Sequence, residues 1–113
     1  MSDCLFCKIA SGQIPAKIVF QDDNVVAFED INPQSPVHII IIPRKHISTV
    51  LDITQSDLDI MGYLYLVAGK IATDMSIDDG FRLVVNCGKS AGQEIQHIHM
   101  HMLGGRLFGW PPG

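Results

Sequence analysis

The sequence has little positive charge and no long hydrophobic run. It contains 8 Lys and Arg against 12 Asp and Glu, which gives a formal net charge of −4 at pH 7. Such a chain provides no basic field to attract a nucleic-acid backbone, so a protein that binds duplexes is not expected. No apolar stretch approaches the roughly 18 residues of a membrane-spanning helix, and residues 1–4 lack the basic start of a signal peptide. We therefore expect a cytoplasmic protein without membrane partners.

Cysteine is also scarce, and its odd count of three does not describe a disulfide framework in a chain without a secretory signal. Cys87 stands alone in an apolar stretch and is most simply a small buried hydrophobic residue. Cys4 and Cys7 have the spacing of two thiolates that bind one metal ion. A redox pair would be expected beside a βαβ pattern, which the sequence lacks, and unused thiols are the remaining alternative.

No repeat, low-complexity tract or block of like charge divides the chain. Its 113 residues, 47% hydrophobic, are enough for one packed core, so we expect a single domain over residues 1–113. Apolar patterns and turn signals predict a short helix over 5–10, strands over 17–20, 25–28 and 38–43, a long helix over 54–75, and strands over 81–86 and 96–103. This order predicts an α+β domain with about five antiparallel strands and both helices on one face.

The long predicted helix is apolar around much of its circumference. One stripe contains Ile60, Leu64, Val67 and Ile71, and a second contains Met61, Tyr65, Ala68, Ala72 and Met75. We expect one sheet to cover only one stripe, so the second predicts a homodimer to which sheet and helix contribute. The alternative is a helix buried under its own loops. The C-terminal segment 109–113 is stiff, aromatic and hard to bury locally, which also favours a partner chain.

Three histidines alternate with apolar residues in the last predicted strand, at His97, His99 and His101. Because successive side chains of a strand point to opposite faces, these imidazoles share one face. Neighbouring histidines are about 6.6 Å apart at a rise of ~3.3 Å per residue, so one metal ion is not expected to bind all three. Three imidazoles are a costly way to fill a core, which favours a reactive or binding role over a structural one.

The loop before this strand contains Asn86, Gly88, Gly92 and Gln93 and can bring backbone N–H groups to an oxyanion. The tripeptide 88–90, Gly-Lys-Ser, resembles the end of a P-loop. However, the earlier glycine that this motif requires would stand at Leu83, so we reject the P-loop. The loop can still bind a phosphate.

The pattern His-x-His-x-His followed by Met102-Leu103 resembles the histidine-triad (HIT) nucleotide-binding family. Other motifs resemble its HINT branch, the purine nucleoside phosphoramidases. They follow the same order over nearly the whole chain and comprise Ile14-Pro15-Ala16-Lys17, Pro43-Arg44-Lys45-His46-Ile47-Ser48, Gly104-Gly105-Arg106 and Trp110-Pro111-Pro112-Gly113. The resemblance implies an HIT-like fold and a homodimer whose C-terminal tail lies near the partner's active site. It also implies hydrolysis of purine nucleoside 5′-phosphoramidates or related nucleotidyl conjugates.

By this resemblance His99 is the nucleophile and forms a covalent nucleotidyl-histidine, while His101 and backbone donors near Gln93 hold the phosphoryl oxygens. An imidazole with a pKa near ~6.5 is mostly neutral at neutral pH and can attack without an activating base. His38 would lie near the triad, where it either tunes the histidines or simply bonds to backbone. The family's nucleoside pocket maps onto Asp30 as the ribose partner and onto apolar residues that cover the base, Leu5, Phe6, Ile9, Phe28 and Ile31.

Family members with the cysteine pair bind structural zinc, which implies a tetrahedral site formed by Cys4, Cys7, His46 and His97. Glu94 replaces a serine that other members carry near the leaving group, so we expect a different substrate preference. Two other functions remain open. One is a zinc hydrolase in which His97 and His99 hold a catalytic metal ion, and the other is a nucleotide-binding scaffold with incidental catalysis.

Overall fold

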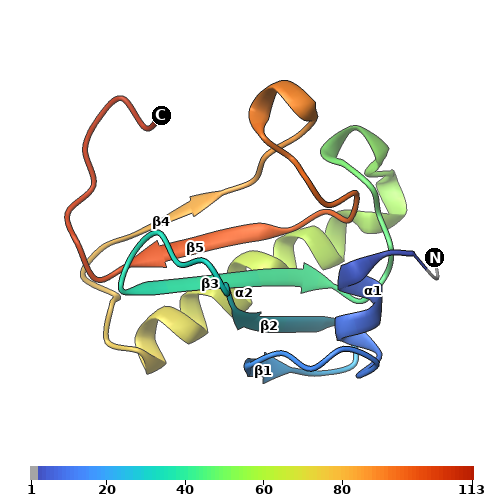
Figure 1. The fold of residues 1–113 in the computed structure, drawn as a ribbon, viewed down its shortest axis with the longest axis horizontal. Helices are drawn as coiled ribbons and strands as arrows, with labels where there is room; N and C mark the ends of the chain where they lie inside the picture. Colours follow the sequence, from blue (N-terminus) through green and yellow to red (C-terminus); the bar gives the residue numbers. More distant parts are fainter. Residues whose placement is uncertain (1–2) are drawn as a thin grey trace.

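The computed structural model describes residues 3–113 and contains one five-stranded antiparallel sheet with strand order β1-β2-β3-β5-β4 (Figure 1). The helices and strands are α1 (Leu5–Ala10), β1 (Ile18–Gln21), β2 (Val25–Glu29), β3 (Val37–Pro43), α2 (Leu58–Asp74), β4 (Phe81–Val84) and β5 (Met100–Gly104). The predicted α+β class, the five strands and the one long helix are confirmed. No helix within these residues is long and apolar enough to span a bilayer.

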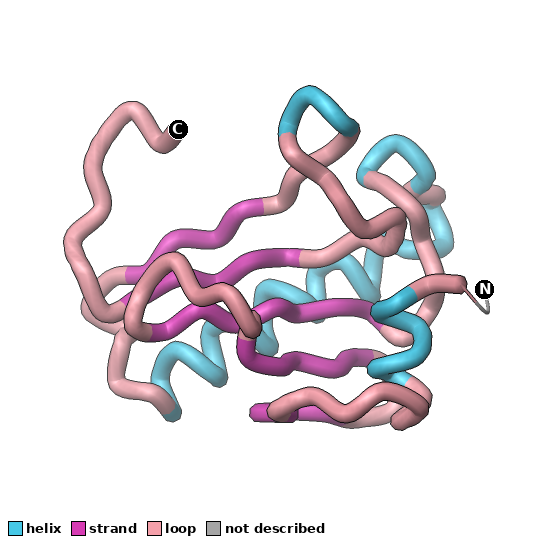
Figure 2. The backbone as a smooth tube through the Cα atoms, in the orientation of Figure 1, coloured by secondary structure: helices cyan, strands magenta, loops and turns pink. Residues whose placement is uncertain are grey.

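The two helices lie on opposite faces of the sheet, so the expectation that they share a face is wrong. In Figure 1, α2 runs behind the strands and α1 lies in front of one end of them, and Figure 2 shows the same layers. Alternation along β3 supplies both faces: Ile39 and Ile41 pack with α2, whereas Ile40 and Ile42 pack with Phe6 of α1. Sequence periodicity identifies the apolar side of a helix but not the sheet face that it covers.

The sheet covers more of α2 than its two apolar stripes suggested. Ala68 and Ala72 of the second stripe are fully buried in the core with Ile39 and Ile41, and Met61 and Met75 pack at its edge. Tyr65 is the exposed member of that stripe. The premise that one sheet covers only one stripe is therefore wrong, because the small alanines fit between the helix and the strands.

The last strand begins at Met100, four residues later than predicted. β3 ends at Pro43, which has no N–H to donate to a ladder. Its carbonyl oxygen instead accepts a hydrogen bond from Nε2 of His97 at 2.8 Å. The Ile98 N–H bonds to the Ile47 carbonyl at 2.6 Å. Residues 97–99 are thus held by side-chain and loop contacts, and the strand pattern continues only from Met100.

Two consecutive glycines, Gly104 and Gly105, lie at the end of β5 in close packing. A Cβ atom on Gly104 would lie 2.5 Å from Cδ1 of Ile77, and one on Gly105 would lie 2.9 Å from Cβ of Pro36. Gly105 also has a φ of 88°, which favours glycine. Arg106 then donates from Nε to the carbonyl oxygen of Gln34 at 3.3 Å. The end of β5 therefore packs against Ile77, and the residues that follow it pack against the loop that precedes β3.

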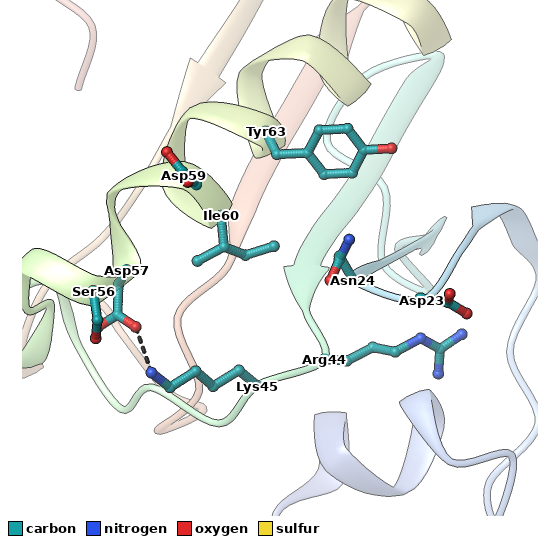
Figure 3. A pocket seen from close by; sticks show the side chains of 9 residues that line it. All are labelled: Asp23, Asn24, Arg44, Lys45, Ser56, Asp57, Asp59, Ile60 and Tyr63. Atoms are coloured by element: carbon teal, nitrogen blue, oxygen red, sulfur yellow. Dashed lines mark hydrogen bonds and ion pairs between the residues drawn. The ribbon is translucent and has the colours of Figure 1, made fainter.

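The start of α2 is fixed by an ion pair between the buried Asp57 and the exposed Lys45, at the wall of a surface hollow of about 510 Å³ (Figure 3). The Asp57 carboxylate accepts from the Lys45 ammonium group and, at 2.9 Å, from the Thr54 N–H. The Lys45 hydrogen bond is the main reason why the pKa of Asp57 lies below its usual range. Because no histidine or cysteine lines this hollow, and its buried carboxylate is already paired, we assign it a structural role.

Candidate active site and metal centre

The histidines gather on the sheet face that α1 covers. His101 lies in β5 beside Ile40 of β3, and its ring centroid is 5.0 Å from that of His99. Phe6 of α1 meets the rings of His99 and His97 edge to face, at centroid distances of 5.0 and 6.0 Å. The three imidazoles therefore lie on the same side of the sheet, as predicted, although only His101 belongs to a strand.

Cys4, Cys7, His46 and His97 form a cluster whose four donor atoms lie within 4.8 Å of one another. Nδ1 of His97 is 3.3 Å from Sγ of Cys4 and 3.5 Å from Sγ of Cys7, and Nδ1 of His46 is 3.3 Å from Sγ of Cys7. Tetrahedral zinc with Zn–S of about 2.3 Å and Zn–N of about 2.05 Å separates S and N ligands by about 3.6 Å. The residues present therefore fit a tetrahedral metal ion, as the sequence predicted.

The hydrogen bonds of His97 suit a metal ligand. Its Nε2–H donates to the Pro43 carbonyl, so the neutral ring presents the lone pair of Nδ1 to the two sulfurs. The ring is fully buried, and this burial is the main reason why its pKa is lowered. His97 does not line the cavity described below, so it has no direct access to a bound molecule there.

His99 is oriented by the backbone of His97. Nδ1 of His99 donates to the His97 carbonyl oxygen at 2.7 Å, which leaves the lone pair on Nε2. His99 is 6% exposed and its remaining open side lines a cavity. In the neutral ring the lone pair therefore lies on Nε2, and the His99 side chain is accessible to a molecule in the cavity. Neither cluster of potential metal ligands within residues 3–113 includes His99.

His38 and His101 have a defined proton arrangement. The backbone N–H of Gln34 donates to Nδ1 of His38 at 3.0 Å, so a neutral His38 carries its proton on Nε2. That Nε2 lies 2.9 Å from Nδ1 of His101 and 3.3 Å from Oδ2 of Asp30. His101 accepts at Nδ1 and consequently carries its own proton on Nε2. Burial lowers the pKa of His38, and burial with the neighbouring His99 and His38 lowers that of His101 to about 4.

Asp30, His38 and His101 form a second group whose donor atoms are close enough for one metal ion. A metal at this position would need a lone pair on Nε2 of His38. The Gln34 N–H on the other side of the ring requires the lone pair at Nδ1 instead, so Nε2 is protonated. We therefore interpret this group as a hydrogen-bond chain rather than a metal site.

Two adjoining cavities collect most of the predicted binding residues. The first, of about 450 Å³, contains the histidine side and is lined by Leu5, Phe6, Asp30, Ile31, Asn32, Gln34, His38, Ile40, Asn86, Gly92, Glu94, Ile95, His99 and His101. The second, of about 460 Å³, is mostly apolar, and among its lining residues are Leu5, Phe6, Ile9, Phe28, Asp30 and Ile31. Because the two share Leu5, Phe6, Asp30, Ile31 and Ile40, together they form a groove with a polar end and an apolar end.

Gln93 is the predicted binding residue that the structure places outside both cavities. Its Oε1 accepts from the Gly88 N–H at 2.9 Å, and its Nε2 donates to the carbonyls of Ser48 and Ile95. Its backbone N–H bonds to the Gly88 carbonyl. Gln93 therefore ties together the loop that carries Asn86 and Gly92, and its donors are already used.

Four residues of the polar end were not predicted: Asn32, Gln34, Ile40 and Ile95. Asn32 and Gln34 lie in a proline-containing loop whose composition indicated only a turn. Ile40 belongs to a run of four isoleucines, and the strand alternation that places it opposite Ile39 was the one available signal.

An α+β domain in which alternating histidines line a cavity is the arrangement of a histidine-triad protein. The chain belongs to the HIT domain family, whose profile matches residues 11–107. A 14 kDa zinc-binding protein of Brassica juncea is 43% identical over 113 residues, which cover 98% of this chain and 100% of the relative. A HIT family hydrolase from Legionella pneumophila superposes with a TM-score of 0.96 at 49% identity and coverage of 98% and 100%. A histidine triad nucleotide-binding protein from Candida albicans gives 0.83 at 27% identity, with coverage of 98% and 85%.

Proposed function

We propose that the chain is a nucleotidyl hydrolase that acts on purine nucleoside 5′-phosphoramidates or related conjugates through a covalent intermediate on His99. The observation that carries this proposal is the hydrogen bond from Nδ1 of His99 to the His97 carbonyl, because it leaves the Nε2 lone pair available at the cavity. The relatives named as a hydrolase and as a nucleotide-binding protein support the same class of activity.

The reaction has two displacements at phosphorus. In the first, Nε2 of His99 forms a bond to phosphorus, the phosphorus–nitrogen bond of the substrate breaks, and the amine leaves after it gains a proton. In the second, water attacks phosphorus, the bond to His99 breaks, and the nucleoside monophosphate is released. The net change is the addition of one water molecule across the phosphorus–nitrogen bond.

The two ends of the groove suit the two parts of such a substrate. Leu5, Phe6, Ile9, Phe28 and Ile31 provide apolar and aromatic surface for a base. The Asp30 carboxylate, oriented by the Asn32 N–H at 2.8 Å, is placed to accept from ribose hydroxyls. Nε2–H of His101 is a donor for a phosphoryl oxygen, and Asn86 and Gly92 line the same end. Glu94 also lines this end.

The metal proposed for the cysteine–histidine cluster is zinc. Two soft thiolates and two imidazoles match its ligand preference, and the Brassica juncea relative is named as a zinc-binding protein. Bound there, zinc would supply structural cross-linking between the N-terminal segment, the end of β3 and the residues before β5. The rival hydrolase with metal on His97 and His99 is disfavoured because the donor atoms gathered around His97 are those of Cys4, Cys7 and His46, and His99 is not among them. Zinc-loaded protein that completes hydrolysis without forming any nucleotidyl-histidine would favour the rival.

We further propose a homodimer. Exposed apolar residues occur on α2 at Leu58, Tyr65 and Leu66 and in the C-terminal segment at Leu107 and Trp110. β4 is an edge strand, with one side open for pairing. Sedimentation is expected to give a dimer at micromolar concentration, and a stable monomer would contradict this proposal.

The test of the catalytic proposal is mass spectrometry of the protein mixed with an adenosine 5′-phosphoramidate and quenched within one turnover. The expected product is a peptide containing His99 whose mass has increased by one adenylyl group. The His99→Asn variant treated identically is the control and should stay unmodified. Full product formation by the parent without any such adduct at any quench time would contradict a covalent mechanism.

A further inference from the structure

We propose that metal binding at Cys4, Cys7, His46 and His97 controls nucleotide affinity by positioning α1, and that a bound nucleotide in turn tightens metal binding. The inference rests on the proposed nucleotide groove and adds a regulatory coupling between two sites that adjoin. Its basis is that one short helix supplies ligands to one site and walls to the other.

The metal ligands flank the residues that line the groove. Cys4 and Cys7 enclose Leu5 and Phe6, and both of these line both cavities. Phe6 is 5% exposed and packs against Phe28 at a centroid distance of 5.5 Å and against the reactive ring of His99 at 5.0 Å. Any movement of residues 4–7 therefore changes the shape of the groove at its centre.

The N-terminal end of α1 has few other attachments. A helix of six residues is not stable by itself, because nucleation costs more than so few hydrogen bonds return. Arg44 donates to the Ala10 carbonyl at the far end of the helix. At the near end the polar contacts to the rest of the fold are those of the two sulfurs with His46 and His97. A metal ion would convert these contacts into bonds, whereas without it only these contacts and apolar packing, chiefly that of Phe6, hold this end.

The metal also bears on the nucleophile by a second route. His97 provides a ligand through its ring and positions His99 through its carbonyl oxygen. A displaced His97 would therefore disturb His99 as well as the apolar wall. If metal binding orders both, a nucleotide that binds the loaded protein does not have to order them, and by linkage the two ligands raise each other's affinity by the same factor.

The first experiment uses the zinc-loaded protein as purified. Zinc transfer to a chromogenic chelator is measured at equilibrium with and without saturating AMP. The expected result is that AMP lowers the apparent zinc dissociation constant about tenfold, within the range typical of coupled sites. The Phe6→Ala variant, measured at AMP concentrations that saturate it, is expected to reduce this factor although all four ligands remain. An unchanged zinc affinity on addition of AMP would overturn the coupling.

The second experiment measures AMP affinity by calorimetry for zinc-loaded protein, zinc-depleted protein and the Cys7→Ser variant, with circular dichroism as the test of folding. Zinc-loaded protein is expected to bind AMP about tenfold more tightly than the other two. Equal affinities would overturn the coupling and leave the proposed function intact. Loaded protein that binds no AMP would overturn both. A chain that takes up no zinc would overturn the coupling and the metal site, and AMP binding would still report on the groove.

Discussion

Two groups of potential ligands lie at either end of the triad, and similar distances in them lead to different chemistry. In the cysteine–histidine cluster three nitrogen–sulfur pairs are 3.3–3.5 Å apart, and in the Asp30, His38 and His101 group the donor atoms are 2.9–3.9 Å apart. Nε2 of His97 donates to a carbonyl, so Nδ1, which faces the cluster, carries the lone pair. Nδ1 of His38 accepts from a backbone amide, so Nε2, which faces Asp30 and His101, carries the proton. The backbone group behind each ring therefore decides whether the ring binds a metal or donates a hydrogen bond.

Among changes to the two ligand groups, the largest effect is expected from breaking the metal cluster. Cys7→Ser should lower zinc affinity by about 10²-fold to 10³-fold, because four ligands share a total of roughly 10–16 kcal/mol in structural zinc sites. Elemental analysis after dialysis against a weak chelator measures this loss. Cys87→Ser is the matched control, since Cys87 lies outside the cluster, and it should retain one zinc per chain. Equal zinc contents in the two variants would contradict the assigned ligands.

Removing His38 tests the hydrogen-bond group without touching the metal. His38→Ala should lower turnover by about 10²-fold with zinc content unchanged, because His101 loses the donor that fixes its tautomer. His38→Gln can still offer an N–H near Nδ1 of His101 and should recover part of the rate. Nitrogen-15 NMR should show Nε2 protonated and Nδ1 unprotonated for both rings in the parent. The opposite tautomer of His38 would contradict the interpretation and reopen a metal site there.

Acid should weaken the hydrogen-bond group through His101. Its pKa of about 4 lies below the ordinary value near 6.5, so between these values the unfolded chain binds a proton that the folded chain excludes. The corresponding contribution to the free energy of unfolding is present above pH 6.5 and is lost as the pH falls toward 4. From pH 7 to pH 5 this amounts to about 2 kcal/mol. Denaturant unfolding measures the free energy of unfolding of the parent and of His101→Asn at pH 7 and at pH 5. The difference between the two proteins should shrink by about this amount at pH 5, and an unchanged difference would contradict the lowered pKa.

The smallest effect concerns Glu94, which lies outside both groups and lines the histidine cavity as well as a neighbouring hollow that includes Asp3. Two carboxylates there favour a positively charged leaving group. Glu94→Gln should lower kcat/KM for a lysine-amide phosphoramidate, whose leaving group keeps an ammonium charge, relative to a neutral alkylamine phosphoramidate by about fivefold or less, the size of an exposed ion pair. An unchanged ratio would show that the leaving group does not approach Glu94.

Much of the fold was predictable because local patterns determine it. The helix over 5–10 has the predicted bounds, and the first three strands differ by one or two residues. The start of β5 was not predictable, because His-x-His-x-His alternates like a strand throughout. In the structure the carbonyl of Pro43, at the end of β3, accepts a hydrogen bond from the side chain of His97. This contact joins residues that are distant in sequence, so the local pattern does not reveal it.

The site was predictable where spacing or resemblance named a side chain. Both cysteines and both histidines of the metal cluster come together as expected. The hydrogen bond from the Gln34 N–H to His38 was not predictable from the sequence, because any residue except proline provides a backbone N–H. Gln93 shows the converse: its side chain type suits phosphate binding, but its neighbours in the fold already use every donor.

The central claim is that His99 attacks phosphorus, and its most direct test is a comparison of binding with turnover in His99→Asn. Asparagine keeps a hydrogen-bonding side chain but has no nucleophilic ring nitrogen. AMP affinity and zinc content should stay within a few fold of the parent, while hydrolysis of an adenosine phosphoramidate should fall by about 10⁴-fold to 10⁶-fold. If the folded variant binds AMP and zinc and keeps turnover within tenfold of the parent, His99 is not the attacking group.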